Sequence, residues 1–390
     1  MNENYLSLSE KWMIDVEAYR QSGGMLIRDP QCRMCKYWIK NDAWHCKQYP
    51  KEKKPSFVLD AEKECTKFNS IEDIRISATS VFECKMKGGI WGAIVGDALG
   101  VPMEFSERHT RKKDPVGEMR AYGTYHQPFG TWSDDSSMML CLIESIVEGL
   151  SCDGLADKFI QFEENAYMTP YNVVFDIGNT VARAIDKMKA GFPAVECGGS
   201  AEYDNGNGSL MRVLPLAFYL REQEAKQQVK VIEDVSAITH RHPISKFSCL
   251  FYIKMAMCLL VDYDKKSAYR ATVDYVKKEL SNSYSDIFPQ FDRLLHGKIQ
   301  NATMRSIRSS GFVIDTLEAA IWCFIKTDSY RECIFKAINL GGDTDTIACI
   351  AGGLAGIYYG VHNIPNNWIQ MLAKKNELNN LIDRFYEAVQ

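Results

Sequence analysis

Two apolar segments, far apart in this chain, carry glycine at every fourth position. The stripes comprise Gly92, Gly96 and Gly100 in GGIWGAIVGDALG, and Gly352, Gly356 and Gly360 in AGGLAGIYYG. In a helix this spacing places each trio along one face. Glycine costs a helix about 1 kcal/mol per position relative to alanine, so the stripes favour two helices whose backbones approach closely. Neither stripe is a G-x-G-x-x-G dinucleotide fingerprint, and ordinary tight helix packing explains both.

Most of the chain after residue 80 shows the three-to-four-residue apolar spacing of amphipathic helices. We predict helices over 136–150, 178–190, 209–220, 244–261, 267–280, 311–326 and 343–359. Alternating strand patterns are scarce. The longest apolar stretch, 247–261, contains Lys254 and is shorter than the roughly 20 residues that cross a bilayer. The sequence therefore predicts a mostly α-helical protein, with this stretch as a buried helix rather than a membrane span.

The length of the chain and a change in its amino-acid composition predict more than one domain. At 390 residues the chain exceeds the size at which one core usually stops growing. Between Asn69 and Ser80 a segment rich in cysteine and lysine gives way to one rich in glycine and alanine. We expect an N-terminal extension over 1–30 with a capped helix ending near Tyr19, a cysteine-rich module over 31–70 and a catalytic domain over 81–390.

Charge and cysteine content limit the partners and the compartment. The 46 basic and 50 acidic side chains leave a net charge of −4, which gives no reason to expect nucleic acid as a partner. The first twenty residues lack the apolar core of a secretory signal. Thirteen cysteines, an odd number, in so long a chain disfavour a disulfide framework. We expect a cytoplasmic protein with reduced thiols that binds neither membrane nor nucleic acid.

Two acidic clusters, separated by about half of the chain, carry the strongest chemical signal. They are GTWSDDSS around Ser133, Asp134 and Asp135, and GGDTDT around Asp343, Asp345 and Thr346. Each precedes an apolar helical run, where the helix dipole favours carboxylates, so simple capping and surface charge remain one reading. Adjacent aspartates repel each other unless a cation lies between them. If the clusters meet in the fold, their oxygen ligands suit Mg²⁺ or Mn²⁺, with room for two ions.

Five ordered blocks resemble the ADP-ribosylglycohydrolase family, which includes the dinitrogenase reductase-activating glycohydrolases. The blocks are GAIVGDALGVPMEF, GTWSDDSSM, GNGSLMRVLPLA, THRHP and NLGGDTDTIACIAGGLAGIYYG, and they span roughly residues 84 to 370. The resemblance implies the family's helical fold and a binuclear magnesium site. Its implied ligands are Ser133, Asp134, Asp135, Asp343, Asp345 and Thr346. Many members have threonine where this chain has Ser133, a change that keeps the oxygen ligand.

The resemblance also implies residues that contact the substrate. Glu104 matches an acidic residue beside the metals, although a solvated loop charge is the simpler reading of that glutamate alone. Residues that would line an ADP-ribose pocket are Gly206, Asn207, Gly208, Ser209, Met211 and His240. A turn followed by a helix N-cap would explain the sequence of residues 206–209 equally well. A histidine such as His240, considered alone, is more often structural. Asp97 and Arg212, inside matching blocks, are interpreted as buried scaffold.

The implied activity is hydrolysis of the glycosidic bond between ADP-ribose and a modified protein side chain or another conjugate, with arginine slightly preferred as the acceptor. Rupture of this bond builds oxocarbenium character at the anomeric carbon. We expect Asp134 or Asp135 to transfer the proton, with Glu104 as the competitor. The alternative is an immunity-type protein whose N-terminal extension occludes an ADP-ribosyltransferase toxin, with or without hydrolysis.

The N-terminal module carries the spacing Cys32-x₂-Cys35-x₁₀-Cys46-x₁₈-Cys65. Four thiolates in so short a segment could hold a structural zinc ion, and a unit of this size needs such a staple because its core is small. His45 is a substitute ligand. Unligated thiols and an iron–sulfur cluster remain alternatives, because the spacing matches neither a C₂H₂ finger nor a symmetric CxxC pair of knuckles.

Overall fold

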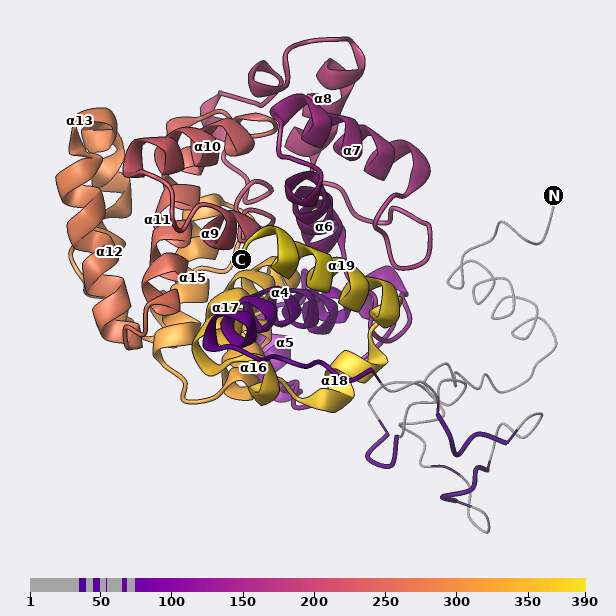
Figure 1. Cartoon of the computed structure of the whole chain (residues 1–390). Coiled ribbons are helices and arrows are strands. Elements are labelled where there is room, and N and C mark those ends of the chain that lie inside the picture. The colour runs from indigo at the N-terminus through magenta and orange to yellow at the C-terminus, as the bar shows by residue number, and fades with distance from the viewer. Residues whose placement is uncertain (1–34, 40–44, 50–53, 55–64, 69–73) are drawn as a thin grey trace.

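The computed structural model describes residues 35–39, 45–49, 54, 65–68 and 74–390 (Figure 1). The helix predicted to end near Tyr19 lies outside these residues, as does Cys32. In the described part of the chain, the backbone pairing of β type is limited to isolated bridges, and helices form the rest of the regular structure. The mostly α-helical class predicted from the sequence is confirmed.

Sixteen helices are described between residues 81 and 388, joined by turns and short 3₁₀ segments. Their bounds are α4 Val81–Gly100, α5 Arg108–Lys113, α6 Asp134–Val147, α7 Cys152–Asn165, α8 Asn179–Lys189, α9 Pro215–Tyr219, α10 Ala225–Ala237, α11 Pro243–Leu260, α12 Lys265–Glu279, α13 Ser281–Tyr284, α14 Asp292–Leu295, α15 Val313–Ile325, α16 Tyr330–Ile338, α17 Thr344–Tyr359, α18 Asn366–Met371 and α19 Lys375–Ala388.

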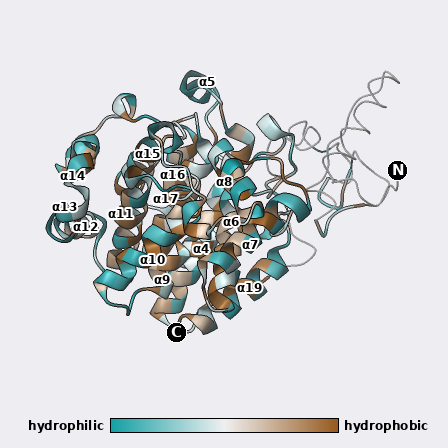
Figure 2. Ribbon diagram, turned by 90° about the horizontal axis from the view of Figure 1, so that it is seen from above, coloured by the Kyte–Doolittle hydropathy of each residue, from teal (hydrophilic) through white to brown (hydrophobic). Residues whose placement is uncertain are grey.

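Helices α4 and α17 form the centre of the domain, and the other helices surround them (Figure 1). Gly92 faces Gly352 and Gly88 faces Gly356 so closely that a Cβ at any of these positions would overlap the opposite backbone. The stripes therefore mark a close helix crossing, as the sequence predicts. Gly360 differs, because it lies beyond α17 as its C-cap with φ +80°. Apolar residues are concentrated on these inner helices, and hydrophilic ones on outer helices such as α12 and α13 (Figure 2).

Most predicted helices occur within a few residues of their expected ends, but the helix predicted over 209–220 is wrong. The chain turns through residues 207–214, and only Pro215–Tyr219 is helical, as α9. Proline fits the first turn of a helix but not its interior, so Pro215 begins this helix rather than continuing an earlier one. The apolar helix α11 is long enough to cross a membrane by composition, yet 72% of its 18-residue window is buried within the fold.

The N-terminal segment is attached to the helical domain at one defined place. The side chain of Gln370 in α18 accepts a hydrogen bond from the Ile74 amide at 3.0 Å and donates one to the Ile74 carbonyl at 2.8 Å. The side chains of Phe68, Ile74 and Ile76 pack against the hydrophobic core. The chain therefore enters the helical domain beside α18, as Figure 1 shows.

Candidate active site

The close crossing of α4 and α17 places the second acidic cluster. Gly100, the last residue of α4, lies against the backbone of Asp345 in the first turn of α17, with no room for a Cβ. The Thr344 hydroxyl donates to the Gly100 carbonyl at 2.8 Å. Small residues thus fix the N-terminus of α17 at the C-terminal end of α4, and with it the carboxylates of Asp343 and Asp345.

The first acidic cluster is placed by Asp97, one turn earlier on α4. Its carboxylate accepts hydrogen bonds from the amide and hydroxyl of Ser133 at 3.0 Å each, and from the amide and hydroxyl of Ser136 at 3.0 and 2.5 Å. These groups belong to the first turn of α6 and its N-cap. Asp97 is therefore a positioning residue, in agreement with its interpretation as buried scaffold, and it orients Asp134 and Asp135.

The two acidic clusters meet. The Thr346 hydroxyl of α17 donates to Asp135 Oδ1 of α6 at 3.3 Å, across 211 positions of sequence. Asp134, Asp135, Asp343 and Asp345 are each at most 8% exposed. Capping on separate surface helices is thereby excluded as the explanation for these aspartates.

Glu104 joins the cluster from the segment that follows α4. Its neighbour Phe105 donates its amide to the Gly342 carbonyl at 2.7 Å, and the Gly342 amide donates to the Ser106 carbonyl at 2.9 Å. Gly341 and Gly342 have φ of +69° and +77°, a conformation that side chains disfavour, and they lie against the backbones of Ser106 and Ser309. The two glycines before Asp343 thus allow the Glu104 segment to approach. Single oxygens of Glu104, Asp343 and Asp345 lie within 4.8 Å of one another.

The crowded carboxyl groups raise one another's pKa. Burial raises the pKa of Asp134, Asp135 and Asp345 well above the usual range, and the neighbouring carboxylates raise it further. Burial, with the charges of Asp176 and Asp343, raises the pKa of Glu104 to about 8. Such a group of carboxyls is stable in its charged form only if a cation compensates it.

Three buried oxygens of the cluster are suited to that cation. Asp135 Oδ2, Asp343 Oδ1 and Glu104 Oε2 have no hydrogen-bond partner among the described residues. No lysine, arginine or histidine of the described chain forms an ion pair within 4.0 Å of these carboxylates. Buried oxygens without partners are costly unless they bind an ion. The residues present therefore fit a hard divalent cation.

Asn207 lies at this cluster and contacts a predicted ligand directly. Its Nδ2 donates to Asp343 Oδ2 at 2.7 Å and to Thr316 Oγ1 at 3.0 Å, and its amide donates to the Gly311 carbonyl at 3.1 Å. The predicted substrate-binding role of Asn207 stays a prediction. In the structure its side chain fixes one oxygen of Asp343 and leaves the other, Oδ1, for a cation.

The other residues of the predicted ADP-ribose pocket surround a tight turn. His240 is 1% exposed, and burial lowers its pKa to about 3, so the ring is neutral. It lies behind Gly208, where an added Cβ would be 2.9 Å from His240 Cε1. Ser209 accepts a buried hydrogen bond from Ser236 at 3.0 Å, and Met211 is 4% exposed. Contacts of these residues with a substrate, including Gly206, stay predictions.

Arg212 supports the same turn from inside. It is fully buried, donates to the carbonyls of Gly208 and Val235, and stacks on Phe159 at 4.8 Å. Its guanidinium forms no ion pair among the described residues. Backbone carbonyls and the face of Phe159 compensate its charge instead, and Arg212 is a buried scaffold residue, as interpreted from the sequence.

Sequence reasoning missed two polar residues of the site, Asp176 and Tyr125. Tyr125 lies beside both Glu104 and Asp176, where hydrogen bonding to its hydroxyl counteracts part of the rise in the pKa of the two carboxyl groups. Burial raises the pKa of Asp176, and the charge of Asp343 raises it further. Asp176 comes just before α8 in the apolar run VVFDIG, so the only sequence signal is one acid among apolar residues. The Tyr125 ring also contacts Phe175 at 5.1 Å and the exposed Phe105 at 6.4 Å, which gives the acidic site an aromatic edge.

These features define a helical protein with a buried carboxylate cluster that could bind a metal ion, assembled at the N-termini of two helices. A family model for ADP-ribosylglycohydrolases matches residues 78–390. The chain belongs to the ADP-ribosylglycohydrolase family, whose members depend on metal ions, and it is an ADP-ribosyl-acceptor hydrolase that cleaves a glycosidic bond.

Relatives of known name agree with this class. The chain is 32% identical over 310 residues to the ADP-ribosylarginine hydrolase Tri1 of Serratia proteamaculans, covering 78% of this chain and 80% of the relative. It is 30% identical over 293 residues to the ADP-ribosyl-[dinitrogen reductase] glycohydrolase of Rhodospirillum rubrum, covering 74% and 90%. A solved structure described as an ADP-ribosylglycohydrolase-related protein complex superposes with a TM-score of 0.68 at 26% identity, covering 79% of this chain and 99% of that one.

Proposed function

We propose that this enzyme removes ADP-ribose from a modified arginine side chain of a protein, using two magnesium ions. The observation that carries the proposal is the meeting of the two acidic clusters, with partnerless buried oxygens on Asp135, Asp343 and Glu104. The relatives of known name support the substrate class, because one is an ADP-ribosylarginine hydrolase.

The ligands proposed for the ions are Ser133, Asp134, Asp135, Asp343, Asp345 and Thr346. Ser133 suits this role because its hydroxyl donates its hydrogen to Asp97 at 3.0 Å, which leaves an oxygen lone pair for a cation. Hard oxygen ligands favour Mg²⁺, and Mn²⁺ accepts the same set. When bound, the ions orient the ribose hydroxyls and lower the pKa of a bound water.

The protein's own groups handle the proton and the geometry. Breaking the bond to the anomeric carbon requires a proton for the leaving nitrogen and a base for the attacking water. Asp134 and Asp135 are proposed for this transfer, and Glu104 is the competing candidate because its raised pKa allows it to hold a proton near neutral pH. Tyr125, which lies beside Glu104 and Asp176, is proposed to donate its hydroxyl hydrogen to one of these two carboxyls at a time.

The aromatic edge of the site suits an arginine acceptor. Phe105, 68% exposed, directly follows Glu104 and contacts the Tyr125 ring, which in turn contacts Phe175. A planar guanidinium stacks on aromatic rings and is attracted by carboxylates, whereas a serine hydroxyl gains neither interaction. The proposal places the modified arginine against this edge, with Glu104 and Asp176 beneath it.

The test is the release of free ADP-ribose from two protein substrates that carry defined linkages, one on arginine and one on serine. Wild type and Asp135→Ala are compared with Mg²⁺, with Mn²⁺ and after chelation by EDTA. We expect release from arginine with either metal, at least about 10-fold less from serine, and at least about a 10³-fold loss in the variant and after chelation.

Glu318→Gln is the matched control, because Glu318 is a buried carboxyl on α15 that pairs with Arg293 at 3.4 Å outside the acidic clusters. It should retain wild-type rates. Equal rates for wild type, Asp135→Ala and chelated enzyme would contradict the role of the carboxylates. Faster release from serine would contradict the arginine acceptor alone.

A second function is proposed for the N-terminal segment, because residues before 78 lie outside the family match. In this immunity-type role the segment would bind an ADP-ribosyltransferase toxin and occlude it, with or without hydrolysis. Co-purification of a transferase with the full chain, lost on deletion of residues 1–70 but kept by Asp135→Ala, would support it. Equal capture by the truncated and full chains would contradict it.

A further inference from the structure

Three cysteines of the N-terminal segment each begin the same local structure. The carbonyls of Cys35, Cys46 and Cys65 accept hydrogen bonds from the amides three residues later, at 3.0, 2.9 and 2.9 Å. In each case the residue that closes the turn is aromatic: Trp38, Tyr49 and Phe68 respectively. A pairing of Trp38 with Cys46 joins the first two turns. Three turns of one design therefore present three thiols, although up to 18 residues separate neighbouring cysteines.

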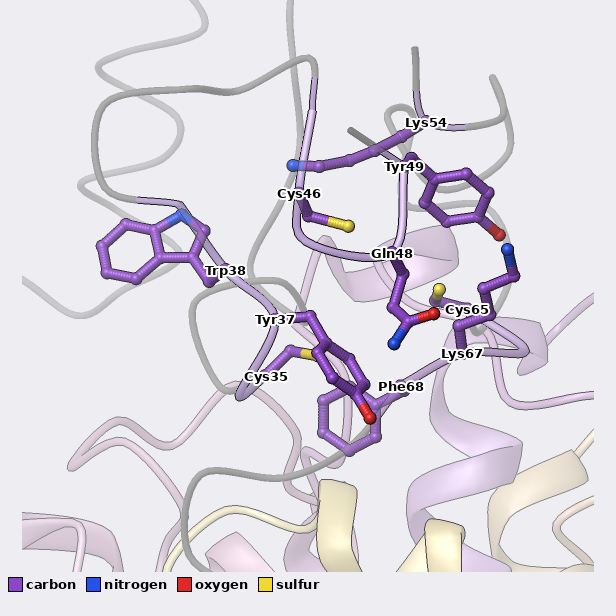
Figure 3. Close-up of a pocket in the computed structure, with 10 residues that line it drawn as sticks. All are labelled: Cys35, Tyr37, Trp38, Cys46, Gln48, Tyr49, Lys54, Cys65, Lys67 and Phe68. Atoms are coloured by element: carbon purple, nitrogen blue, oxygen red, sulfur yellow. The ribbon is translucent and has the colours of Figure 1, made fainter. Parts of the chain in front are cut away.

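The three thiols line one pocket. Figure 3 shows them on different sides of it, with Tyr37, Tyr49 and Phe68 around them. The three turns thus converge on one cavity.

Among the described residues of this segment, the two most buried side chains are polar. Among its described residues, only Cys46 and Lys54 are buried, at 8% and 2% exposure, whereas Tyr37, Trp38 and Tyr49 are only half-buried. The aromatic side chains of the described turns are thus not fully buried, and so small a unit commonly depends on a metal ion for its stability.

We infer that Cys35, Cys46 and Cys65 are ligands of a structural zinc ion that holds these three turns together. Sulfur ligands in a tetrahedral arrangement favour zinc. The three sulfur atoms do not all lie within 4.8 Å of one another in the structure. Zn–S bonds of about 2.3 Å would therefore draw them closer together. The C-x-x-C spacing makes Cys32, which lies outside the described residues, the sequence candidate for a fourth ligand. This site contains soft sulfur ligands, so it is chemically distinct from the oxygen site of the helical domain.

The test is the zinc content of the full-length protein, purified in excess Mg²⁺ without chelator and measured by elemental mass spectrometry. We expect about one zinc per chain in wild type and less than about a tenth of that in Cys46→Ser and Cys65→Ser. Replacement by Co²⁺ should give the visible absorption of cobalt thiolate in wild type but not in Cys46→Ser or Cys65→Ser. Asp135→Ala should keep its zinc, which separates this site from the proposed catalytic one.

Cys152→Ser is the matched control, because Cys152 is a half-buried, unbridged thiol at the start of α7, in the helical domain. It should retain one zinc per chain. Zinc contents that are the same in Cys46→Ser and wild type would overturn the inference. So would a wild-type protein that holds no zinc, or one that holds iron and acid-labile sulfide instead. Circular dichroism of each variant shows whether the helical domain has folded.

Discussion

The carboxylate site and the thiol cluster solve the same physical problem in opposite ways. The carboxylates of Asp135 and Asp343 lie at the N-termini of α6 and α17, two long helices packed into the hydrophobic core, and this packing holds the carboxylates close together despite their repulsion. The thiols of Cys35, Cys46 and Cys65 extend from three short turns, and the described residues before Val81 contain no helix. A rigid scaffold can hold a reactive site in advance, whereas a small segment depends on its ligand for its own structure.

Among the variants that test this comparison, Gly100→Ala is expected to change stability and activity most. A Cβ at residue 100 would overlap the backbone of Asp345, so α4 and α17 must separate at the active site. We expect a loss of about 3 kcal/mol in the free energy of unfolding, measured by urea denaturation, together with loss of ADP-ribose release. Gly117→Ala is the control, since no atom lies within 4 Å of an added Cβ there. A fully stable and active Gly100→Ala would show that the carboxylate site is not preformed by this crossing.

Asp97→Asn should weaken the carboxylate site without unfolding it. The amide group would present donor hydrogens to the amides and hydroxyls of Ser133 and Ser136, which now donate to Asp97. We expect a 10- to 100-fold higher Mg²⁺ concentration for half-maximal activity, with maximal activity recovered at high Mg²⁺. An unchanged Mg²⁺ titration would contradict the positioning role of Asp97. Asp153→Asn, which loses only one 3.4 Å hydrogen bond, is the matched control.

Metal removal should make the stability of the helical domain depend on pH. The pKa of Glu104 is raised from 4.5 to about 8 in the folded chain, so the folded state holds a proton that the unfolded state has lost. Stability without metal should therefore fall as pH rises between about 4.5 and 8, by up to about 1.4 kcal/mol per pH unit for each such proton. Urea unfolding at pH 6 and pH 8 in EDTA measures this slope, and saturating Mg²⁺ should abolish it. Equal slopes with and without Mg²⁺ would contradict the site.

Cys46→Ser should have the smallest effect on the helical domain. Release of ADP-ribose from a small ADP-ribosylated arginine peptide should change less than about 2-fold, because the two sites are built on separate elements. The same variant should lose its zinc, so the two measurements separate the regions. A loss of activity as large as that of Asp135→Ala would instead show that the N-terminal segment helps to assemble the active site.

The sequence predicts the fold and the acidic cluster because both leave local patterns. Glycine at every fourth position and the runs SDDSS and GGDTDT are visible in the letters alone. Asp176 and Tyr125 could not be found in this way, since each is a single residue whose role arises only from tertiary packing against Glu104. The prediction of a helix over 209–220 was wrong because it relied on the apolar spacing and disregarded Pro215, which begins a new helix at that position.

The two hydrogen bonds between Gln370 and the Ile74 backbone limit how far the thiol cluster can lie from α18. Five residues lie between Phe68 and Ile74, and the six Cα-to-Cα steps that join the two span only about 20 Å even when fully extended. The turns of the proposed zinc site must therefore stay close to α18 and cannot reach the opposite side of the helical domain. Any macromolecule captured there is held within a fixed radius of the entry point of the chain, whatever its own shape.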